Sequence, residues 1–455
     1  MTTSSKYSIF LFSLVMLLGA CGCEKPKSPD EPQPVPKDTM VVEPEDMIWS
    51  GSKLCFNLPV ENPDSVAAKV PIKVRITTDK KQLAVELTDT IEVAGQTEWN
   101  YVVTPTEPLA PGFYRANCYV NGKATRNFNF GIDPFDIVSA PDMQPDFDAF
   151  WQTAKDQLAA IDMQPNLIEL PNKSSQSRKV YLVELRSVPD GLTGEPVVVR
   201  GYYCEPQDGQ KHPVIMHFYG YDTQGTKAKV ECPSGASSTY AEFYLSHRGQ
   251  YINNRPESSR EPDGLGDLEN SYGDWFAWHF GDKDSYYYRG AFMDCVQAVR
   301  FMATRETSDM TKLFGEGSSQ GGALSYACAA LSDYPFKAIA PNVAFLGDFP
   351  DYFQIVGWPA EVAKKEAKKQ GMTDEQMYAF LSYFDTKNLA PRISCAVLGS
   401  SGLQDGTCPP HTNIAPFNNL KTPAADKEYV FVAKMGHDYP PGWSSRILAF
   451  FKERM

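Results

Sequence analysis

Apolar and polar positions follow two different patterns along the chain, one before and one after about residue 133. Residues 70–76 alternate apolar with polar side chains, which is typical of a strand with one buried face. Asn121-Gly122 separates two further short apolar runs and is a hairpin signal. The region 47–132 is therefore predicted to be a small all-β sandwich.

From residue 133 onwards, continuous apolar runs of strand length alternate with segments of helical periodicity. Residues 180–186, 197–203 and 213–221 read as strands, and Tyr286–Thr304 carries apolar residues at helical spacing. Such alternation predicts an α/β domain over 133–455 with a mostly parallel sheet. Ligand sites in these sheets lie at the carboxyl ends of the strands.

A charged helical segment, Glu361–Phe384, interrupts the alternation. It could cap the site or be a surface excursion.

One stretch carries a chemical signature. Gly317-Ser318-Ser319-Gln320-Gly321 fits G-x-S-x-G, with an apolar run before it and a small-residue helical run after it. This is the strand–turn–helix context of a nucleophile elbow, in which small residues let the strand and helix pass closely. We therefore predict an α/β-hydrolase fold with Ser319 as nucleophile and the Gln320 amide directed at the oxyanion. The alternative is a glycine-rich turn whose serine has no chemical role.

A serine nucleophile of this fold takes an acid and then a histidine later in the chain. Only His411 and His437 follow Ser319. His437 comes directly after the apolar strand 428–433, where this fold supplies its base. His411 lies beside two prolines and is interpreted as structural or close to the substrate.

The acid is expected after the preceding strand, and Asp405 lies just past the apolar run 394–399. Asp385 precedes that run and Asp348 precedes the helical segment, so both are weaker rivals; a turn-stabilising role is the alternative for Asp405. With these residues, Ser319 attacks an acyl carbon, His437 moves the proton and Asp405 orients the imidazole.

The second oxyanion amide is expected in the turn after residues 217–220. This chemistry needs no metal and no cofactor, and no zinc or nucleotide motif occurs in the sequence.

Several segments together resemble the acetyl xylan esterase and cephalosporin C deacetylase family, and the resemblance covers roughly residues 133–455. They are Phe147-Asp-Ala-Phe-Trp151, His217-Phe-Tyr-Gly-Tyr221, Arg248-Gly-Gln250, the elbow, Asp405-Gly-Thr-Cys-Pro-Pro410 and Gly436-His437. The resemblance implies an α/β-hydrolase that removes acetyl groups from sugars and small esters. It also implies that Ser319, Asp405 and His437 form the triad and that Tyr221 and Gln320 supply the oxyanion amides.

The chain departs from the family pattern at three positions. Ser318 replaces a usual glycine, His247 stands where aspartate is frequent, and Tyr251 stands where glycine is usual. These departures bear on the pocket wall and on substrate preference. Family members often form closed hexamers, but an added N-terminal domain could block that assembly, so the oligomeric state is left open.

The first residues predict export. Lys6 and the apolar run 9–18 precede Leu18-Gly19-Ala20-Cys21, which resembles a bacterial lipobox. We expect a signal peptide over 1–20, acylation of Cys21, a proline-rich linker over 21–46, and a lipid anchor in a bacterial membrane on the periplasmic or cell-surface side. An ordinary cleaved signal is the alternative. The ten cysteines show no zinc spacing, and no disulfide is assigned.

The fold class predicted is thus an α/β-hydrolase preceded by a small all-β immunoglobulin-like sandwich. The net charge of −13 argues against a nucleic-acid partner. The leading prediction is a serine esterase that deacetylates xylan-type carbohydrates, with aromatic residues around Trp275 and Tyr286–Tyr288 stacking on sugars or, alternatively, filling the core. A serine peptidase of the oligopeptidase type and a non-catalytic glycan-binding lipoprotein are the alternatives.

Overall fold

The computed structural model describes residues 40–51, 54–191, 194–221, 238–250 and 274–455, together with residues 230, 232, 233 and 252. The predicted signal peptide, Cys21, most of the predicted linker and Tyr251 lie outside the described residues. Within the described part, none of the helices is long and apolar enough to cross a bilayer.

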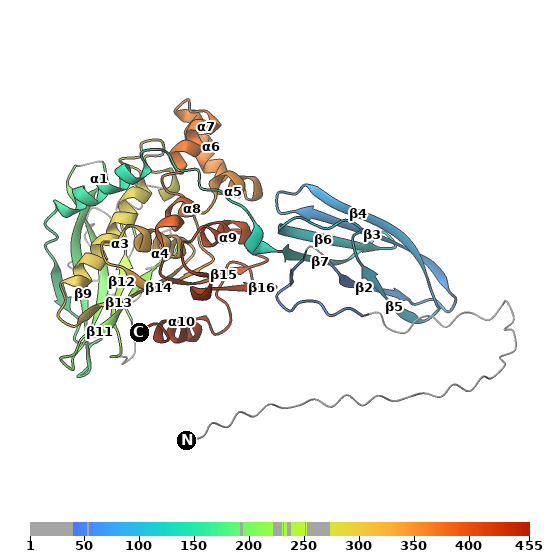
Figure 1. Cartoon of the computed structure of the whole chain (residues 1–455), viewed down its shortest axis with the longest axis horizontal. Helices are drawn as coiled ribbons and strands as arrows, with labels where there is room; N and C mark the ends of the chain where they lie inside the picture. Colours follow the sequence, from blue (N-terminus) through green and yellow to red (C-terminus); the bar gives the residue numbers. More distant parts are fainter. Residues whose placement is uncertain are drawn as a thin grey trace, which may run out of the picture. The chain divides into compact units, whose positions relative to one another are not determined.

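The N-terminal part is built from seven strands in two sheets that share one apolar core. The larger sheet has the order β1-β7-β6-β3-β4, with β1 parallel to β7, and the smaller sheet pairs β2 with β5 (Figure 1). The two sheets therefore form a β-sandwich around this core. Asn121 and Gly122 both have positive φ, as a two-residue hairpin requires. The strands are β1 (Ile48–Trp49), β2 (Phe56–Asn62), β3 (Ala68–Thr78), β4 (Leu83–Val93), β5 (Thr97–Val103), β6 (Gly112–Val120) and β7 (Lys123–Ile132).

A nine-stranded sheet organises the rest of the chain, in the order β16-β15-β14-β13-β11-β12-β10-β9-β8. The six strands from β16 to β12 run parallel, and β10, β9 and β8 are antiparallel to their neighbours. The prediction of a mostly parallel sheet is confirmed. The strands are β8 (Asn166–Glu169), β9 (Arg178–Pro189), β10 (Pro196–Pro206), β11 (His212–Phe218), β12 (Ala241–Ser246), β13 (Ser308–Ser318), β14 (Phe336–Asn342), β15 (Ala396–Gly402) and β16 (Lys427–Val432).

Both faces of this sheet are covered because its central strands are apolar on both sides. In β11, Val214 and Met216 pack into the core shared with α1, α3 and α4, whereas Ile215 packs into the core under α10. Figure 1 shows α10 on the opposite side of the sheet from α3 and α4. The helices are α1 (Phe147–Ala159), α3 (Tyr287–Ala303), α4 (Gln320–Leu331), α5 (Phe349–Ile355), α6 (Ala360–Lys369), α7 (Asp374–Leu381), α8 (Thr386–Leu389), α9 (Pro410–Asn418) and α10 (Trp443–Lys452).

Residues 40–455 form one compact unit, and the sandwich touches the α/β part near the end of β15. Asn129 Nδ2 on β7 donates to the Leu403 carbonyl at 2.7 Å, and the Phe113 and Phe431 rings lie 6.0 Å apart. Leu403 is two residues before Asp405, so the sandwich helps to position the loop that follows β15.

Candidate active site

The turn between β13 and α4 places Ser319 at its tip with φ 59° and ψ −123°. A non-glycine residue in this region stores strain on the order of 1–3 kcal/mol and needs tightly packed surroundings. The surroundings of this turn are backbone atoms. A Cβ on Gly317 would lie 2.4 Å from the Gly321 carbonyl oxygen, and a Cβ on Gly321 would lie 2.1 Å from the Phe218 carbonyl oxygen. The two glycines therefore let strand and helix pass closely, and the predicted elbow geometry is present.

Gln320 is the first residue of α4, so its backbone N–H has no partner within the helix and lies at the positive end of the helix dipole. Its side chain is fully buried and held at both ends. Nε2 lies 2.8 Å from His247 Nε2, and Oε1 accepts from the Tyr288 hydroxyl at 2.9 Å. The amide that follows the serine is thus fixed in direction by two further side chains.

His247 must be neutral for this arrangement, since its Nε2 accepts from the Gln320 amide. Its proton is then on Nδ1, which lies 2.9 Å from the Tyr287 hydroxyl, and that hydroxyl donates to the Arg248 carbonyl at 2.8 Å. Burial lowers the pKa of His247 to about 4. The same burial that hides this ring therefore keeps it in the form that orients Gln320.

Asp405 and His437, predicted as acid and base, lie together. His437 Nδ1 is 2.8 Å from Asp405 Oδ2, and the other carboxylate oxygen accepts the backbone N–H groups of Thr407 and Cys408, each at 2.8 Å. The Asp405 side chain is 0% exposed and that of His437 is 30% exposed. A buried, hydrogen-bonded carboxylate therefore fixes one imidazole nitrogen, while the ring remains open to solvent on its other side.

Two contacts connect this pair to the elbow. Asn342 Nδ2 donates to Ser318 Oγ at 2.8 Å and to the Asp438 carbonyl at 3.1 Å, so it bridges the residue before Ser319 and the residue after His437.

On the other side, the Ser319 hydroxyl lies beside the Cys408 thiol, whose pKa burial raises well above its ordinary value. The sequence reasoning did not single out Cys408 as part of the site. The sequence feature that could have pointed to Cys408 is its position in the loop directly after the predicted acid.

The turn after β11 leads to Tyr221, whose side chain is anchored in an aromatic wall. Its hydroxyl donates to Asp274 Oδ1 at 2.6 Å, and its ring centroid lies 5.0 Å from that of Trp275 and 5.3 Å from that of Trp358. Burial raises the pKa of Tyr221, so the phenol stays protonated.

The backbone of this turn is also held. Gln250 Nε2 donates to the Gly220 carbonyl at 2.8 Å, which fixes the turn directly before the Tyr221 amide.

Most aromatic residues considered for sugar stacking are core residues instead. Trp275 and Tyr286–Tyr288 are at most 2% exposed and belong to the core of the α/β part. Trp358, which sequence reasoning did not single out, contacts Tyr221 and donates from Nε1 to Asp274 at 3.2 Å. It lies two residues before α6, so the predicted helical segment borders this wall.

The rival acids and the second histidine have other partners. Asp385 accepts the N–H groups of Asp348, Phe349 and Lys387, each at 2.9 Å, and caps α8. Asp348 pairs with Lys387, and His411 on α9 lies against Asp348 and not against Asp405. Of the three candidate acids, it is Asp405 that lies within hydrogen-bond distance of His437.

The strand order, the elbow and the acid–base pair define an α/β-hydrolase. The sequence model of the acetyl xylan esterase (AXE1) family matches residues 137–455. The chain therefore belongs to the acetyl xylan esterase (AXE1) family and is a carboxylic ester hydrolase.

Individual relatives agree with this assignment. Acetyl esterase Axe7A of Xylanibacter ruminicola is 25% identical over 315 residues, which is 69% of this chain and 68% of the relative. The structure of the acetyl xylan esterase from Paenibacillus sp. R4 is similar with a TM-score of 0.58 and 26% identity, covering 70% of this chain and 98% of that one. The structure of acetyl xylan esterase 1 from Thermoanaerobacterium sp. JW/SL YS485 shares the fold, with a TM-score of 0.52, 23% identity and coverages of 70% and 96%.

Proposed function

We propose that the protein is a serine esterase that removes acetyl groups from acetylated xylan-type oligo- or polysaccharides. The observation that carries the proposal is the pairing of His437 Nδ1 with the buried carboxylate of Asp405 in the loops that border the Ser319 elbow. The family of the chain and the acetyl esterase and acetyl xylan esterase activities for which its relatives are named support an acetylated xylan as substrate.

The proposed reaction uses the three residues in fixed roles. Ser319 Oγ forms a bond to the acetyl carbonyl carbon while His437 Nε2 takes the hydroxyl proton, and Asp405 stabilises the resulting imidazolium. When the tetrahedral intermediate collapses, the bond from carbon to the sugar oxygen breaks, and His437 gives its proton to that leaving oxygen. Water then attacks the acetyl-Ser319 ester with His437 again as base, releasing acetate and restoring the serine.

Two backbone N–H groups, those of Gln320 and Tyr221, are proposed to bind the oxyanion. The buried Gln320 side chain and the Gln250 contact to Gly220 support this role because they fix both peptide segments before any substrate binds. Preorganised donors of this kind cost no reorganisation when charge develops.

The test is acetate release from acetylated xylan and from 4-nitrophenyl acetate, with a peptide anilide as a third substrate. Ser319→Ala is expected to reduce kcat on both esters by a factor of about 10⁴ or more, whereas Ser318→Ala, one residue away, is expected to lose less than about tenfold because only its hydrogen bonds to Asn342 and Tyr439 are removed. Equal activity of Ser319→Ala and the wild type would refute the nucleophile. Turnover of the anilide without turnover of either ester would instead indicate a peptidase.

We also propose that the chain is exported and anchored to a bacterial membrane through a lipid on Cys21. The small residues directly before this cysteine support the proposal. In cells labelled with a fatty-acid analogue, Cys21→Ser should abolish labelling and release the protein from membranes, whereas Cys23→Ser should not. Retained labelling in Cys21→Ser would contradict the assignment.

A further inference from the structure

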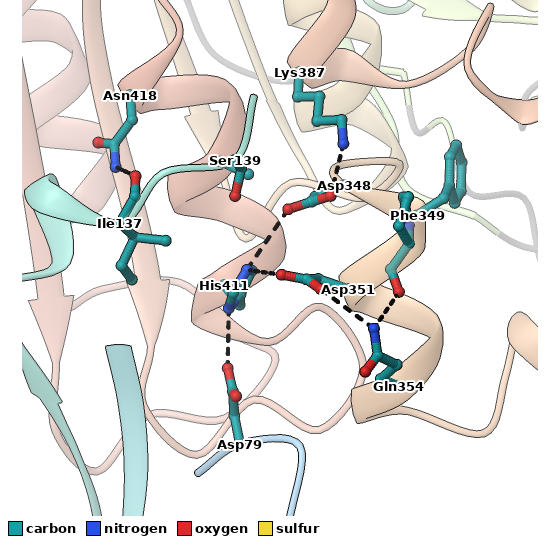
Figure 2. Close-up of polar contacts among 12 residues, drawn as sticks. Asp79, Ile137, Ser139, Asp348, Phe349, Asp351, Gln354, Lys387, His411 and Asn418 are labelled. Carbon is teal, nitrogen blue, oxygen red and sulfur yellow. Dashed lines mark hydrogen bonds and ion pairs between the residues drawn. The ribbon is translucent and has the colours of Figure 1, made fainter. Parts of the chain in front are cut away.

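A cluster of charged side chains outside the proposed esterase site joins α5, α9 and the turn after β3. His411 on α9 lies between Asp348 and Asp351 at the start of α5 on one side and Asp79 on the other, as Figure 2 shows. His411 is 7% exposed and Asp348 is 3% exposed. The esterase mechanism uses none of these residues.

Three donor atoms of this cluster converge. His411 Nε2 is 3.0 Å from Asp351 Oδ2 and 3.6 Å from Asp348 Oδ2, and the ligand atoms of these three residues lie within 4.8 Å of one another. Four ligands at about 2.0 Å around a tetrahedral ion are separated by roughly 3.3 Å. The observed separations bracket that value.

The imidazole nitrogen that faces the carboxylates is itself poorly satisfied. Within the described residues, His411 Nε2 is buried and makes no hydrogen bond of acceptable geometry, although two carboxylate oxygens are near it. The ring therefore does not direct Nε2 at either oxygen, as a well-formed imidazolium–carboxylate pair would require. Once its proton is lost, a buried imidazole nitrogen beside two carboxylates offers a donor set that suits a metal ion.

Each of the three donors is also held from behind. His411 Nδ1 is 3.1 Å from Asp79 Oδ2, Asp348 Oδ1 accepts from Lys387 at 2.8 Å, and Asp351 Oδ1 accepts from Lys80. A carboxylate on the far nitrogen of a ligating histidine, and hydrogen bonds on the far oxygens of ligating carboxylates, are the usual outer partners of protein metal sites.

The charges of this cluster leave room for a cation. Among the described residues that pair with one another here, four are carboxylates and two are ammonium groups: Asp79, Asp142, Asp348, Asp351, Lys80 and Lys387. With His411 neutral, as metal binding requires, a divalent ion would offset this excess of negative charge in a mostly buried place.

We propose that Asp348, Asp351 and His411 bind a zinc ion, with Asp79 orienting the imidazole. The nitrogen ligand and the small number of oxygens favour zinc over magnesium or calcium, which prefer shells of six or more oxygens. A water molecule or the nearby Ser139 hydroxyl (Figure 2) would complete a tetrahedral set. The ion would join α5 to α9, which begins directly after the Asp405 loop, so its role is structural.

A proton on His411 is the competing occupant. Although burial opposes it, the neighbouring carboxylates of Asp348, Asp351 and Asp79 raise the pKa of His411 to about 11. Zinc must therefore displace this proton, and the experiment has to distinguish a bound metal from an imidazolium.

The experiment uses full-length protein without a histidine tag, stripped with EDTA and then titrated with zinc chloride. Isothermal titration and elemental analysis after dialysis give affinity and stoichiometry, and thermal unfolding gives the accompanying shift in Tm. We expect one zinc per chain, a higher Tm with zinc than with magnesium, and an unchanged kcat on 4-nitrophenyl acetate. Asp351→Asn should weaken zinc binding at least tenfold, and Asp79→Asn by about 10–100-fold, whereas Asp374→Asn, an exposed aspartate on α7, should leave it unchanged.

Two results would overturn the proposal. One is a wild-type chain that retains no zinc at micromolar free metal, which would leave the proton as the occupant of His411. The other is zinc binding that is equally tight in the wild type and in Asp351→Asn, which would place the metal elsewhere. The first result needs only the wild-type chain, so it tests the proposal even if a variant fails to fold.

Discussion

Replacing Asp405 by asparagine tests the proposed triad, because it changes which nitrogen of His437 carries the proton. Asp405 Oδ1 accepts two backbone N–H groups, so the asparagine oxygen has to occupy that side and its NH₂ group has to face His437. An NH₂ group there can only donate, which forces His437 Nδ1 to be the unprotonated nitrogen. The proton then sits on Nε2, the nitrogen that must accept the Ser319 proton, so the base is blocked although the fold is unchanged.

The expected loss follows from this wrong tautomer. A block of this kind lowers kcat by about 10⁴ in a serine hydrolase, which corresponds to about 5 kcal/mol of transition-state free energy. The assay is kcat for 4-nitrophenyl acetate and acetylated xylan, with circular dichroism and thermal unfolding to verify the fold. Asp438→Asn, at the exposed position next to His437, is the matched control and should retain at least about a third of kcat. A loss of less than tenfold in a folded Asp405→Asn variant would refute the reasoning.

Three further predictions concern stability. Gly321→Ala places a Cβ 2.1 Å from the Phe218 carbonyl oxygen and should lower the free energy of unfolding in urea by about 1–3 kcal/mol or more; an unchanged value would contradict the close approach. Arg248→Lys removes the two-pronged pair with Asp294, which is 0% exposed, and should cost on the order of 3 kcal/mol in the same assay, whereas wild-type stability would show that one ammonium suffices.

Burial lowers the pKa of His217, but its hydrogen bonds to Glu242 and Glu316 outweigh this effect and raise the pKa to about 9. A raised folded-state pKa contributes stability that is fully present below about pH 6.5 and is lost as the pH rises through 9, by at most about 3 kcal/mol. Urea unfolding at pH 6.5 and pH 9.5 should show this loss in the wild type and a smaller one in His217→Gln, and equal losses in both would count against it.

The sequence pattern was sufficient for those parts of the fold that have a strong period. The alternation in residues 70–76 became β3, and the helical spacing from Tyr286 became α3, Tyr287–Ala303. In contrast, β4 was not singled out, although its residues alternate between apolar and polar side chains as those of β3 do. Most of its side chains are exposed or half-buried because β4 lies at the edge of the sheet and pairs with β3 alone.

For the site, the order of residues along the chain was enough to predict candidates, whereas side-chain contacts between distant segments could not be predicted. Ser319, Asp405 and His437 were predicted because each follows an apolar strand, and β13, β15 and β16 do end shortly before them. The interpretation of His411 as structural or close to the substrate could not include Asp79, which is 332 residues away. Contacts over such separations depend on how elements pack, and spacing within one segment does not encode them.

Residues 247–250 hold both proposed oxyanion amides in place at once. His247 holds the Gln320 side chain behind the elbow, and Gln250 holds the Gly220 carbonyl before Tyr221. Arg248 ties the segment between them to Asp294 on α3. An aspartate at position 247 could also accept from Gln320, but it would bury a charge there, whereas a neutral histidine buries none. At this position the neutral histidine thus makes the hydrogen bond that orients Gln320 without placing a charge behind the elbow.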